Sequence, residues 1–419
     1  EGGENPGEEG EEGEIPTEEE LAAVKLKKVS NMPVAGFTVF LKERYKDLPP
    51  PSEEEVEEVP PAPVVPENTE VSNEQTRETT TPTTTPVKPP VVKKVVNNNP
   101  VSPPTEFVEA LRYVERSTGN IYQTFADKIE ERRFSGTVIP KIYDAYFGNE
   151  GQSVVMRHLK PNNTTIETFS GVLPKEKLGE DLPSNDLTGS FLVDDIKDIS
   201  LSPDTNKIFY LLNIGQSTVG TILNILDGKK VQVFDSVFTE WNSFWPNNKI
   251  ITMTTKPSGS VLGYMYMIDV DKKNFTKVLG DVNGLTTLMS PNGKLVLVGN
   301  NSLSLFVYNL ETKGYQKLGL DTLPEKCVWN KTSESIYCAV PVFIEGANYP
   351  DDWYRGEVSF SDQIWKINIS SGSSSLLVDP ILVIGGEDVD GIKLALDVNE
   401  KYLFFVNKKD SFLWELELN

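Results

Sequence analysis

The chain has little of what most enzymes use for catalysis or metal binding. Its 419 residues include one histidine, His158, and two cysteines. No P-loop, G-x-S-x-G or H-E-x-x-H pattern occurs, and no spaced Cys/His set of a zinc site is present. A lone histidine is more often incidental than catalytic. NTPase, serine-hydrolase and zinc-protease functions therefore have no support in the sequence.

Cysteine is too scarce for a disulfide-stabilised scaffold. The two that are present, Cys327 and Cys338, flank a short segment with a turn pattern. We expect them to face each other on adjacent strands. They can form a single disulfide if the compartment is oxidising.

Long hydrophobic runs are also missing. No stretch of eighteen apolar residues occurs, so the sequence predicts no membrane-spanning segment. The chain begins at Glu1 rather than methionine, and we expect that a signal peptide or an anchor preceded it. We therefore predict an extracytoplasmic protein, either secreted or anchored at the cell surface.

Positive charge is scarce relative to negative charge. The net charge is −22, and residues 1–20 contain ten Glu with no Lys or Arg. We predict that residues 1–20 form a disordered acidic tether. The negative net charge argues against nucleic acid and anionic membranes as partners. It favours cations, neutral glycans or basic proteins.

Residues 42–104 are rich in proline, threonine and acidic residues. Closely spaced prolines prevent a helix, and the few valines cannot form a core. We predict that this stretch is a disordered insertion within a domain that covers residues 21–419.

After residue 105 the sequence shows no helical periodicity. It shows instead a recurring strand–turn–strand pattern. In residues 285–300 the turn Ser290-Pro291-Asn292-Gly293 separates two apolar β-rich runs, as turn residues of this kind do. Related turns contain Pro203 and Pro246, and the three prolines are 43 and 45 positions apart. A period of about 40–50 residues in an all-β chain is typical of propeller blades, each a four-stranded sheet.

These turns, and the outer strands that end in Asp or Asn, resemble the WD40-like, TolB-type β-propeller family, whose repeats carry a strand ending in S-P-D/N-G-K. The resemblance implies a fold and no catalytic residue. The Trp-Asp dipeptide of true WD40 repeats is missing. More loosely, the layout resembles uncharacterised secreted or membrane-tethered propeller proteins of bacteria.

Counting strands predicts an all-β, seven-bladed propeller. The first strand of blade 1 is expected at 33–40, and its insertion is 42–104. The last blade supplies three strands, ending with 412–418, and residues 24–29 are expected to add its fourth. Such mixed, Velcro-type closure removes an exposed sheet edge. The first strands of the later blades are expected to start near Ile139, Ile196, Glu240, Gly284, Glu325 and Gly391.

Strand order also assigns loops to faces. We call bottom the face with the loops between first and second strands and between third and fourth strands. The top carries the loops between second and third strands and between successive blades. Both the tail and the insertion then leave from the bottom, so a tethered ring would present its top. The long loop 342–360 lies on the top.

The top loop 346–357 is the predicted binding site. Aromatic and arginine side chains dominate binding hot spots because they combine large rigid area with a polar end. Trp353 is the predicted anchor; the alternative is that its ring folds back over blade 6. By contrast, Trp241, Trp245 and Trp329 are expected to pack between blades. The predicted binding residues are Tyr349, Asp351, Asp352, Trp353, Tyr354 and Arg355.

The densest acidic group on the predicted top comprises Glu387, Asp388 and Asp390. Ca²⁺ requires several convergent oxygen ligands, which such a group can offer. The alternative is an ordinary solvated rim, because no D-x-D-x-D-G loop occurs. No other cofactor is expected.

We therefore interpret the chain as a non-catalytic binding or assembly module of the cell envelope that recognises a protein or glycan. Two alternatives remain at this point. One is a Ca²⁺-dependent hydrolase or lyase with top-face carboxylates, and the other is a structural subunit of a surface assembly.

Overall fold

The computed structural model describes residues 25–46, 103–178, 186–383 and 386–418. The chain divides into two units, one formed by Glu1–Glu43 with Phe107–Asn419 and the other by Arg44–Glu106. In the described part of the second unit Arg44 Nε donates to Glu106 Oε1 at 2.9 Å. The expected tether, residues 1–20, and residues 47–102 of the expected insertion lie outside the described residues.

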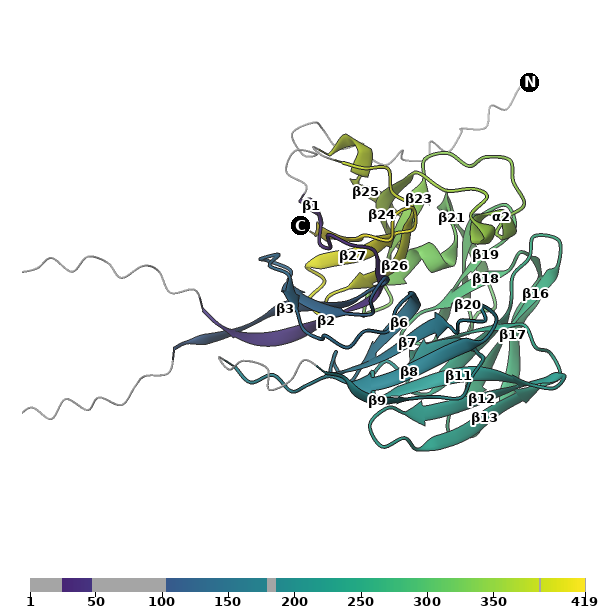
Figure 1. The fold of residues 1–419 in the computed structure, drawn as a ribbon. Coiled ribbons are helices and arrows are strands. Elements are labelled where there is room, and N and C mark those ends of the chain that lie inside the picture. The colour runs from purple at the N-terminus through teal and green to yellow at the C-terminus, as the bar shows by residue number, and fades with distance from the viewer. Residues whose placement is uncertain (1–24, 47–102, 179–185, 384–385, 419) are drawn as a thin grey trace, which may run out of the picture. The chain divides into compact units, whose positions relative to one another are not determined.

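Seven antiparallel four-stranded sheets form the propeller (Figure 1). Blade 1 contains β2 (Val34–Tyr45), β3 (Thr105–Glu115), β4 (Ile121–Phe125) and β5 (Arg132–Arg133). Blade 2 contains β6 (Ile142–Gly148), β7 (Ser153–Leu159), β8 (Ile166–Val172) and β9 (Thr188–Phe191). Blade 3 contains β10 (Ile196–Leu201), β11 (Lys207–Ile214), β12 (Ser217–Asn224) and β13 (Lys230–Ser236). Blade 4 contains β14 (Trp241–Asn247), β15 (Ile250–Thr255), β16 (Leu262–Asp269) and β17 (Phe275–Asn283).

The remaining sheets follow the same order. Blade 5 contains β18 (Thr286–Met289), β19 (Leu295–Gly299), β20 (Ser304–Asn309) and β21 (Tyr315–Asp321). Blade 6 contains β22 (Cys327–Trp329), β23 (Ser335–Pro341), β24 (Asp362–Asn368) and β25 (Ser374–Val378). Blade 7 contains β26 (Gly391–Leu396), β27 (Tyr402–Asn407) and β28 (Leu413–Glu417), with β1 (Leu26–Lys28). The helices within the described residues are short: η1 (Pro324–Lys326), α2 (Asp351–Arg355) and η2 (Pro380–Leu382).

The recurring bottom turn is held by its own polar side chains. Ser290 Oγ accepts the Leu295 N–H at 3.0 Å, and Asn292 Oδ1 accepts the Lys294 N–H at 2.9 Å. Gly293 has φ 71°, which glycine adopts without steric cost. In blade 3 Ser202 Oγ accepts the Lys207 N–H at 2.9 Å in the same way. The turn residues that revealed the repeat thus fix the hairpin geometry.

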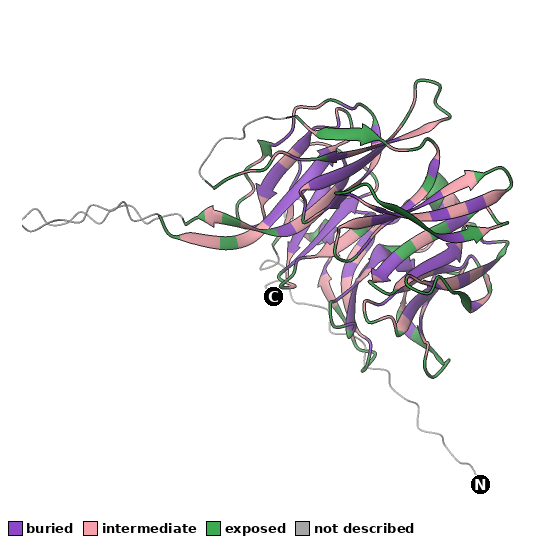
Figure 2. Ribbon diagram, turned by 90° about the horizontal axis from the view of Figure 1, so that it is seen from below, coloured by how far each residue is buried: buried purple, intermediate pink, exposed green. Residues whose placement is uncertain are grey.

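Burial follows strand position within a blade. The second strands β23 and β27 are buried along their whole length, whereas most residues of the outer strand β17 are exposed (Figure 2). An inner strand is covered on both faces by neighbouring blades, so it contains nearly continuous apolar residues. The core of the protein therefore lies between the blades.

Each pair of neighbouring blades shares a buried hydrophobic cluster, and Trp241, Trp245 and Trp329 belong to such clusters as predicted. The contact between blades 7 and 1 closes the ring. Representative pairs are Ile121 with Ile142, Val155 with Ile208, Phe209 with Trp241, Met265 with Val296, Leu297 with Ile336, Ile364 with Leu403, and Phe404 with Leu111.

The mixed closure is confirmed. β1 pairs antiparallel with β28, with Lys27 opposite Glu415. Only Leu26–Lys28 form the strand, a shorter segment than the predicted 24–29.

The predicted start of the insertion is wrong by four residues, because Val34–Tyr45 is one continuous strand. Its charged residues have partners that stabilise the extended conformation. Lys42 forms an ion pair with Glu176, and Arg44 with Glu106. Within the described residues no helix is long and apolar enough to cross a membrane.

Candidate functional site

The predicted binding loop forms a hydrophobic cluster of its own, in addition to those between blades. Tyr349, Trp353 and Phe360 from this loop pack with Leu303 and Leu323 from blade 5 and the segment after it. The five-residue helix α2 carries Trp353 in its middle. The loop is therefore a folded cap on the top of the propeller.

Trp353 is not the exposed anchor that the sequence predicted. Its side chain is buried, with 3% of the residue exposed. Its Nε1 donates to Asp390 Oδ2 at 2.8 Å, and its ring stacks on Phe360 with centroids 6.0 Å apart. Tyr349 is equally buried. Burial of these large rings stabilises the cap. The Trp353 ring thus folds back as the alternative interpretation had it, but it packs with Leu303 and Leu323 of blade 5 and the segment after it, not over blade 6.

A buried charge cluster lies beneath Trp353. Lys326 Nζ contacts Asp362 Oδ2 at 2.7 Å and Asp390 Oδ1 at 2.5 Å, and all three side chains have no exposed area. Burial raises the pKa of Asp362 to about 6. Burial also acts to raise the pKa of Asp390, but the charge of Lys326 and hydrogen bonds from Trp353 and Phe360 lower it below its ordinary value. One lysine thus compensates two carboxylates.

The predicted Ca²⁺ ligands do not converge. Glu387 contacts Lys28 at 2.7 Å, Asp388 pairs with Lys409, and Asp390 is held by Lys326. Because each carboxylate has its own lysine partner, the three do not share one cation. In the parts of the chain that the structure describes, no three His, Cys, Asp or Glu side chains are placed to hold a metal ion.

The remaining charged residues of the predicted site hold the loop in place. Asp351 Oδ2 accepts the N–H of Gly259 at 2.6 Å, which ties α2 to the top loop of blade 4. Asp352 Oδ2 accepts the Asn348 N–H at 2.8 Å. Arg355 pairs with Asp352 and Glu357 at the surface. These contacts explain the charges without a ligand.

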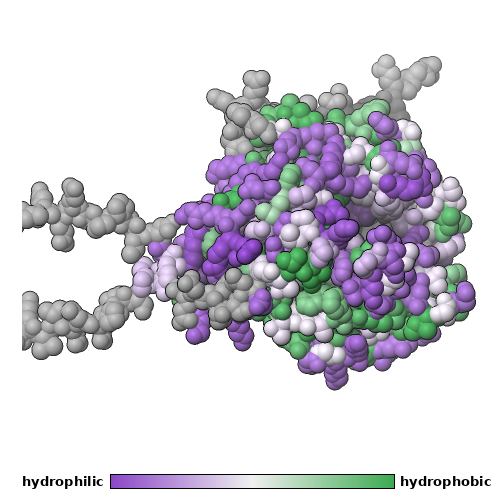
Figure 3. All heavy atoms as spheres, in the orientation of Figure 1, coloured by the Kyte–Doolittle hydropathy of each residue, from purple (hydrophilic) through white to green (hydrophobic). Residues whose placement is uncertain are grey.

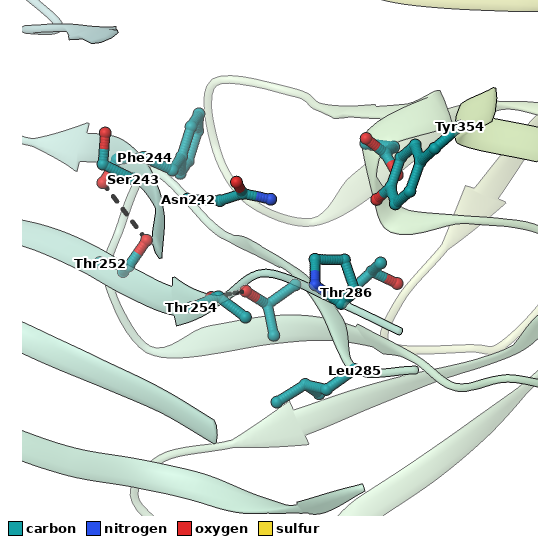
Figure 4. Close-up of a pocket in the computed structure, with 11 residues that line it drawn as sticks. Asn242, Ser243, Phe244, Thr252, Thr254, Leu285, Thr286 and Tyr354 are labelled. Carbon is teal, nitrogen blue, oxygen red and sulfur yellow. Dashed lines mark hydrogen bonds between the residues drawn. The ribbon is translucent and has the colours of Figure 1, made fainter. Parts of the chain in front are cut away.

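Tyr354 differs from the other aromatic residues of this loop, Tyr349 and Trp353, because 40% of it is exposed. Its hydroxyl donates to Glu325 Oε1. Both residues line a pocket of about 60 Å³ between the first strands of blades 4 and 5 and the helix α2 (Figure 4). Other residues of its wall are Asn242, Ser243, Phe244 and Thr287.

The blade geometry explains how these residues meet. First strands start at the top and face the middle of the ring, so Asn242, Ser243 and Phe244 at the start of β14 enter the pocket. Thr254 on β15 and Thr287 on β18 share a hydroxyl contact of 2.6 Å across the blade boundary. Glu325 enters from η1, just before the first strand of blade 6.

Glu325 carries the negative charge of the pocket. Burial raises the pKa of Glu325, and the Tyr354 hydrogen bond with the charges of Lys326 and Lys408 opposes that shift. Its only polar partner in the described part of the chain is the Tyr354 hydroxyl, so it forms no ion pair there. The pocket thus holds a carboxylate whose charge has no direct cationic partner.

A second polar group near the middle of the ring has its charges paired. Lys393 Nζ donates to Asp144 Oδ1 and to the Ala35 carbonyl, both at 2.7 Å. Arg157 NH1 lies 3.4 Å from Asp144 Oδ2, and its NH2 donates to the Ile196 carbonyl at 2.7 Å. These bonds join blades 7, 1, 2 and 3, so this group has a structural explanation.

The two cysteines lie opposite each other in the register of β22 and β23. Their Cα atoms are 4.1 Å apart, and their sulfur atoms form a disulfide of 2.11 Å. The disulfide cross-links the first two strands of blade 6, directly after Glu325 and Lys326. It therefore stiffens the segment that supplies the pocket carboxylate.

The sequence did not predict the pocket. Its signal was weak: short polar residues such as Asn242, Ser243 and Thr287 at the starts of first strands, where a buried strand would have apolar ones. Those starts belong to neighbouring blades, and the packing of blade 4 against blade 5 brings them together.

No known protein family model matches the chain, and no curated protein sequence matches it. Among solved structures, an oligogalacturonate lyase from Vibrio parahaemolyticus is similar, with 9% identity and a TM-score of 0.49 over 74% of this chain and 86% of the lyase. At this distance the likeness transfers no residue role. In all, 1283 solved chains match, so the fold is common and does not indicate a function.

Proposed function

We propose that the protein is a non-catalytic binding or assembly module that recognises a protein partner through the top of its propeller. The observation that carries this proposal is the exposed apolar side chains on three top loops. One of these loops supplies Pro257 to the pocket wall, and the other two lead into β14 and α2, whose residues line the pocket. Exposed apolar side chains in a group mark interaction surfaces more often than chance. We call these three loops the apolar top loops: residues 237–240, 256–262 and 342–350.

Each apolar top loop presents two neighbouring apolar residues. Val237 and Phe238 are 78% and 66% exposed, and they precede the strand that supplies Ser243. Val261 and Leu262 are 58% and 47% exposed. The third loop presents the pair Val342 and Phe343, 59% and 73% exposed, and continues into α2.

The apolar top loops are held in defined positions. The Phe238 carbonyl accepts the Nε1–H of Trp241 at 2.9 Å, which fixes the first loop to the core. Asp351 fixes the second loop through Gly259, and the Tyr349 hydroxyl fixes the third by donating to the Glu345 carbonyl at 3.0 Å. Preorganised loops lose little conformational entropy on binding, which favours affinity.

On the bottom face the exposed apolar side chains stand singly at the turns, for example Leu226 and Val398, each 56% exposed. The hairpins of this face are the tight turns described above, whose polar side chains bond to their own backbone. Hydrophilic and hydrophobic side chains both appear on the side of the molecule that Figure 3 presents, which is the side seen in Figure 1. Polar turns of this kind need no partner, so the top is the better candidate for recognition.

The size of the pocket also favours a macromolecular partner. Sites for small-molecule substrates typically enclose about 300–1,000 Å³, whereas this pocket has about 60 Å³. A space this small suits one side chain of a partner that also covers the surrounding loops.

An extracytoplasmic location is part of the proposal. The disulfide between Cys327 and Cys338 supports it, because such bonds persist in oxidising compartments. The acidic charge of the chain also supports a partner with basic groups.

The proposal can be tested with peptides selected from a random display library on the full chain. Phe238→Ser and Phe343→Ser change exposed side chains, so they should leave the melting temperature unchanged and weaken the selected peptides about tenfold or more. Leu226→Ser, at a bottom turn where Leu226 is 56% exposed, is the matched control and should have no effect. Unchanged binding in both top variants, or binding of glycans but no peptide, would contradict the proposal.

A further inference from the structure

The pocket beside Tyr354 has a chemistry more specific than a general docking surface. We propose that it accepts the cationic end of one lysine or arginine side chain from the partner. This inference rests on the proposed function and adds the class of residue that the partner must present.

Charge is the first argument. Glu325 is an exposed carboxylate at the pocket wall that accepts only the Tyr354 hydroxyl and has no ion pair among the described residues. The neighbouring Lys326 points away, toward Asp362 and Asp390. A cation entering the pocket would supply the missing ion pair, and an anion would be repelled.

Aromatic rings are the second argument. Phe244 and Tyr354 line the pocket and are 37% and 40% exposed, so ring surface is open to a ligand (Figure 4). A cation near a ring face is attracted by the ring quadrupole. The same chain uses this contact elsewhere, for example Lys408 Nζ at 4.2 Å from the ring centroid of Trp353.

Hydrogen-bond acceptors are the third argument. Asn242, Ser243 and Thr287 bring oxygen atoms to the wall, and an ammonium or guanidinium group has only donors to offer. Thr286 also lines the pocket, is 5% exposed, and its Oγ1 has no partner within the described residues. The wall therefore holds acceptors that a cationic group can satisfy.

Volume is the fourth argument. A space of about 60 Å³ holds a few water-sized groups at most. It accommodates the end of a side chain but not a sugar ring with its hydroxyls. A metal ion would find one carboxylate here, which is too few charged ligands for a Ca²⁺ site.

The test uses the displayed peptides and a double-mutant cycle. Glu325→Gln keeps an oxygen for the Tyr354 hydroxyl but removes the charge. Glu311→Gln is the matched control, because Glu311 is exposed at a bottom turn and pairs only with Lys294. The double-mutant cycle combines Glu325→Gln in the protein with one substitution in the selected peptide, in which methionine replaces the basic residue.

We expect the selected peptides to share a lysine or arginine. Glu325→Gln should lower the affinity of the peptides roughly tenfold to hundredfold, as loss of a charged hydrogen bond does. Glu311→Gln should leave the affinity unchanged. Replacing the basic residue should have the same effect on the wild-type protein and little further effect on Glu325→Gln. The affinity should also fall with added salt, and less steeply in Glu325→Gln.

The failures of the two proposals are distinguishable. Peptides that depend on Phe238 and Phe343 but lack a basic residue, or bind Glu325→Gln equally well, would overturn the cationic pocket and leave the top-face proposal intact. Peptides that are insensitive to Phe238→Ser, Phe343→Ser and Glu325→Gln alike would overturn both.

Discussion

Trp353 and Tyr354 are neighbours in one turn of helix, yet the structure places them in opposite environments. Trp353 is 3% exposed and closes a buried cluster of Lys326, Asp362 and Asp390. Tyr354 is 40% exposed and borders an open pocket with Glu325. The Trp353 side of α2 is thus a structural clamp, and the Tyr354 side is a surface available to a partner.

The comparison shows how charge separates the two sides. Under Trp353 every charge has a partner, at 2.5–2.7 Å around Lys326. Beside Tyr354 the carboxylate of Glu325 has a hydrogen bond but no cation. The buried charges around Lys326 are paired with one another and hold the cap, whereas the charge of Glu325 at an open pocket is available for binding.

The largest effect on stability should come from Lys326→Met. The variant leaves Asp362 and Asp390 buried without a cation, which typically costs about 3–5 kcal/mol of unfolding free energy. Urea denaturation at pH 7 measures it. A decrease in unfolding free energy below about 1 kcal/mol would show that Lys326, Asp362 and Asp390 do not form a buried charge cluster.

Trp353→Ala should lower the free energy of unfolding by about 3–5 kcal/mol. The substitution leaves a cavity where the ring was and removes the hydrogen-bond donor of Asp390. Trp353→Phe keeps most of the ring and should lose only about 1.5–3 kcal/mol, the usual value of a hydrogen bond to a charged group. The same denaturation experiment separates the two variants. If both variants unfold at the same urea concentration as the wild type, Trp353 lies at the surface and the account of its burial is wrong.

Asp362→Asn should change the pH dependence of stability. The folded protein holds the Asp362 proton up to a pKa of about 6, well above the ordinary value of about 3.9. Between these values the folded state binds more protons than the unfolded one, so stability falls as pH rises. Glu415, whose pKa burial raises to about 7, adds to the fall in wild type and variant alike.

The measurement for Asp362→Asn is the urea midpoint from pH 4 to pH 7 in both proteins. The variant should gain stability relative to wild type as pH rises from about 4 to 6. Parallel curves for the two proteins would show that Asp362 does not titrate in this window.

Tyr354→Ala should have the smallest effect on stability, about 1 kcal/mol or less, because 40% of the residue is already exposed. Its effect should be on peptide binding instead. A destabilisation as large as that of Trp353→Ala would remove the distinction between the two sides of α2.

Much of the fold could be predicted from the sequence, because its signals are local. The Ser-Pro-Asn-Gly turn fixes one hairpin, and its recurrence indicates blades. The last blade has only three strands at the end of the chain, which indicates that 24–29 adds the fourth. Cys327 and Cys338 were placed opposite each other because a short turn sets the register of β22 and β23.

The site could not be predicted in the same way. A sequence of Asp, Trp, Tyr and Arg does not reveal which ring faces the core. This depends on Asp390, which comes from a distant segment, and on Phe360 at the end of the same loop. The acidic group at 387–390 could not be distinguished from a metal site without Lys28, Lys326 and Lys409, which are distant in the chain.

The most direct test of the account is hydroxyl-radical footprinting of the full chain, with and without a selected peptide, read by mass spectrometry at single residues. Tyr354 should be oxidised readily and Trp353 hardly at all, and the peptide should protect Tyr354 but not Tyr315, which is 53% exposed at the start of β21 near the bottom. Oxidation of Trp353 before Tyr354, or protection of Tyr315 in place of Tyr354, would contradict the account.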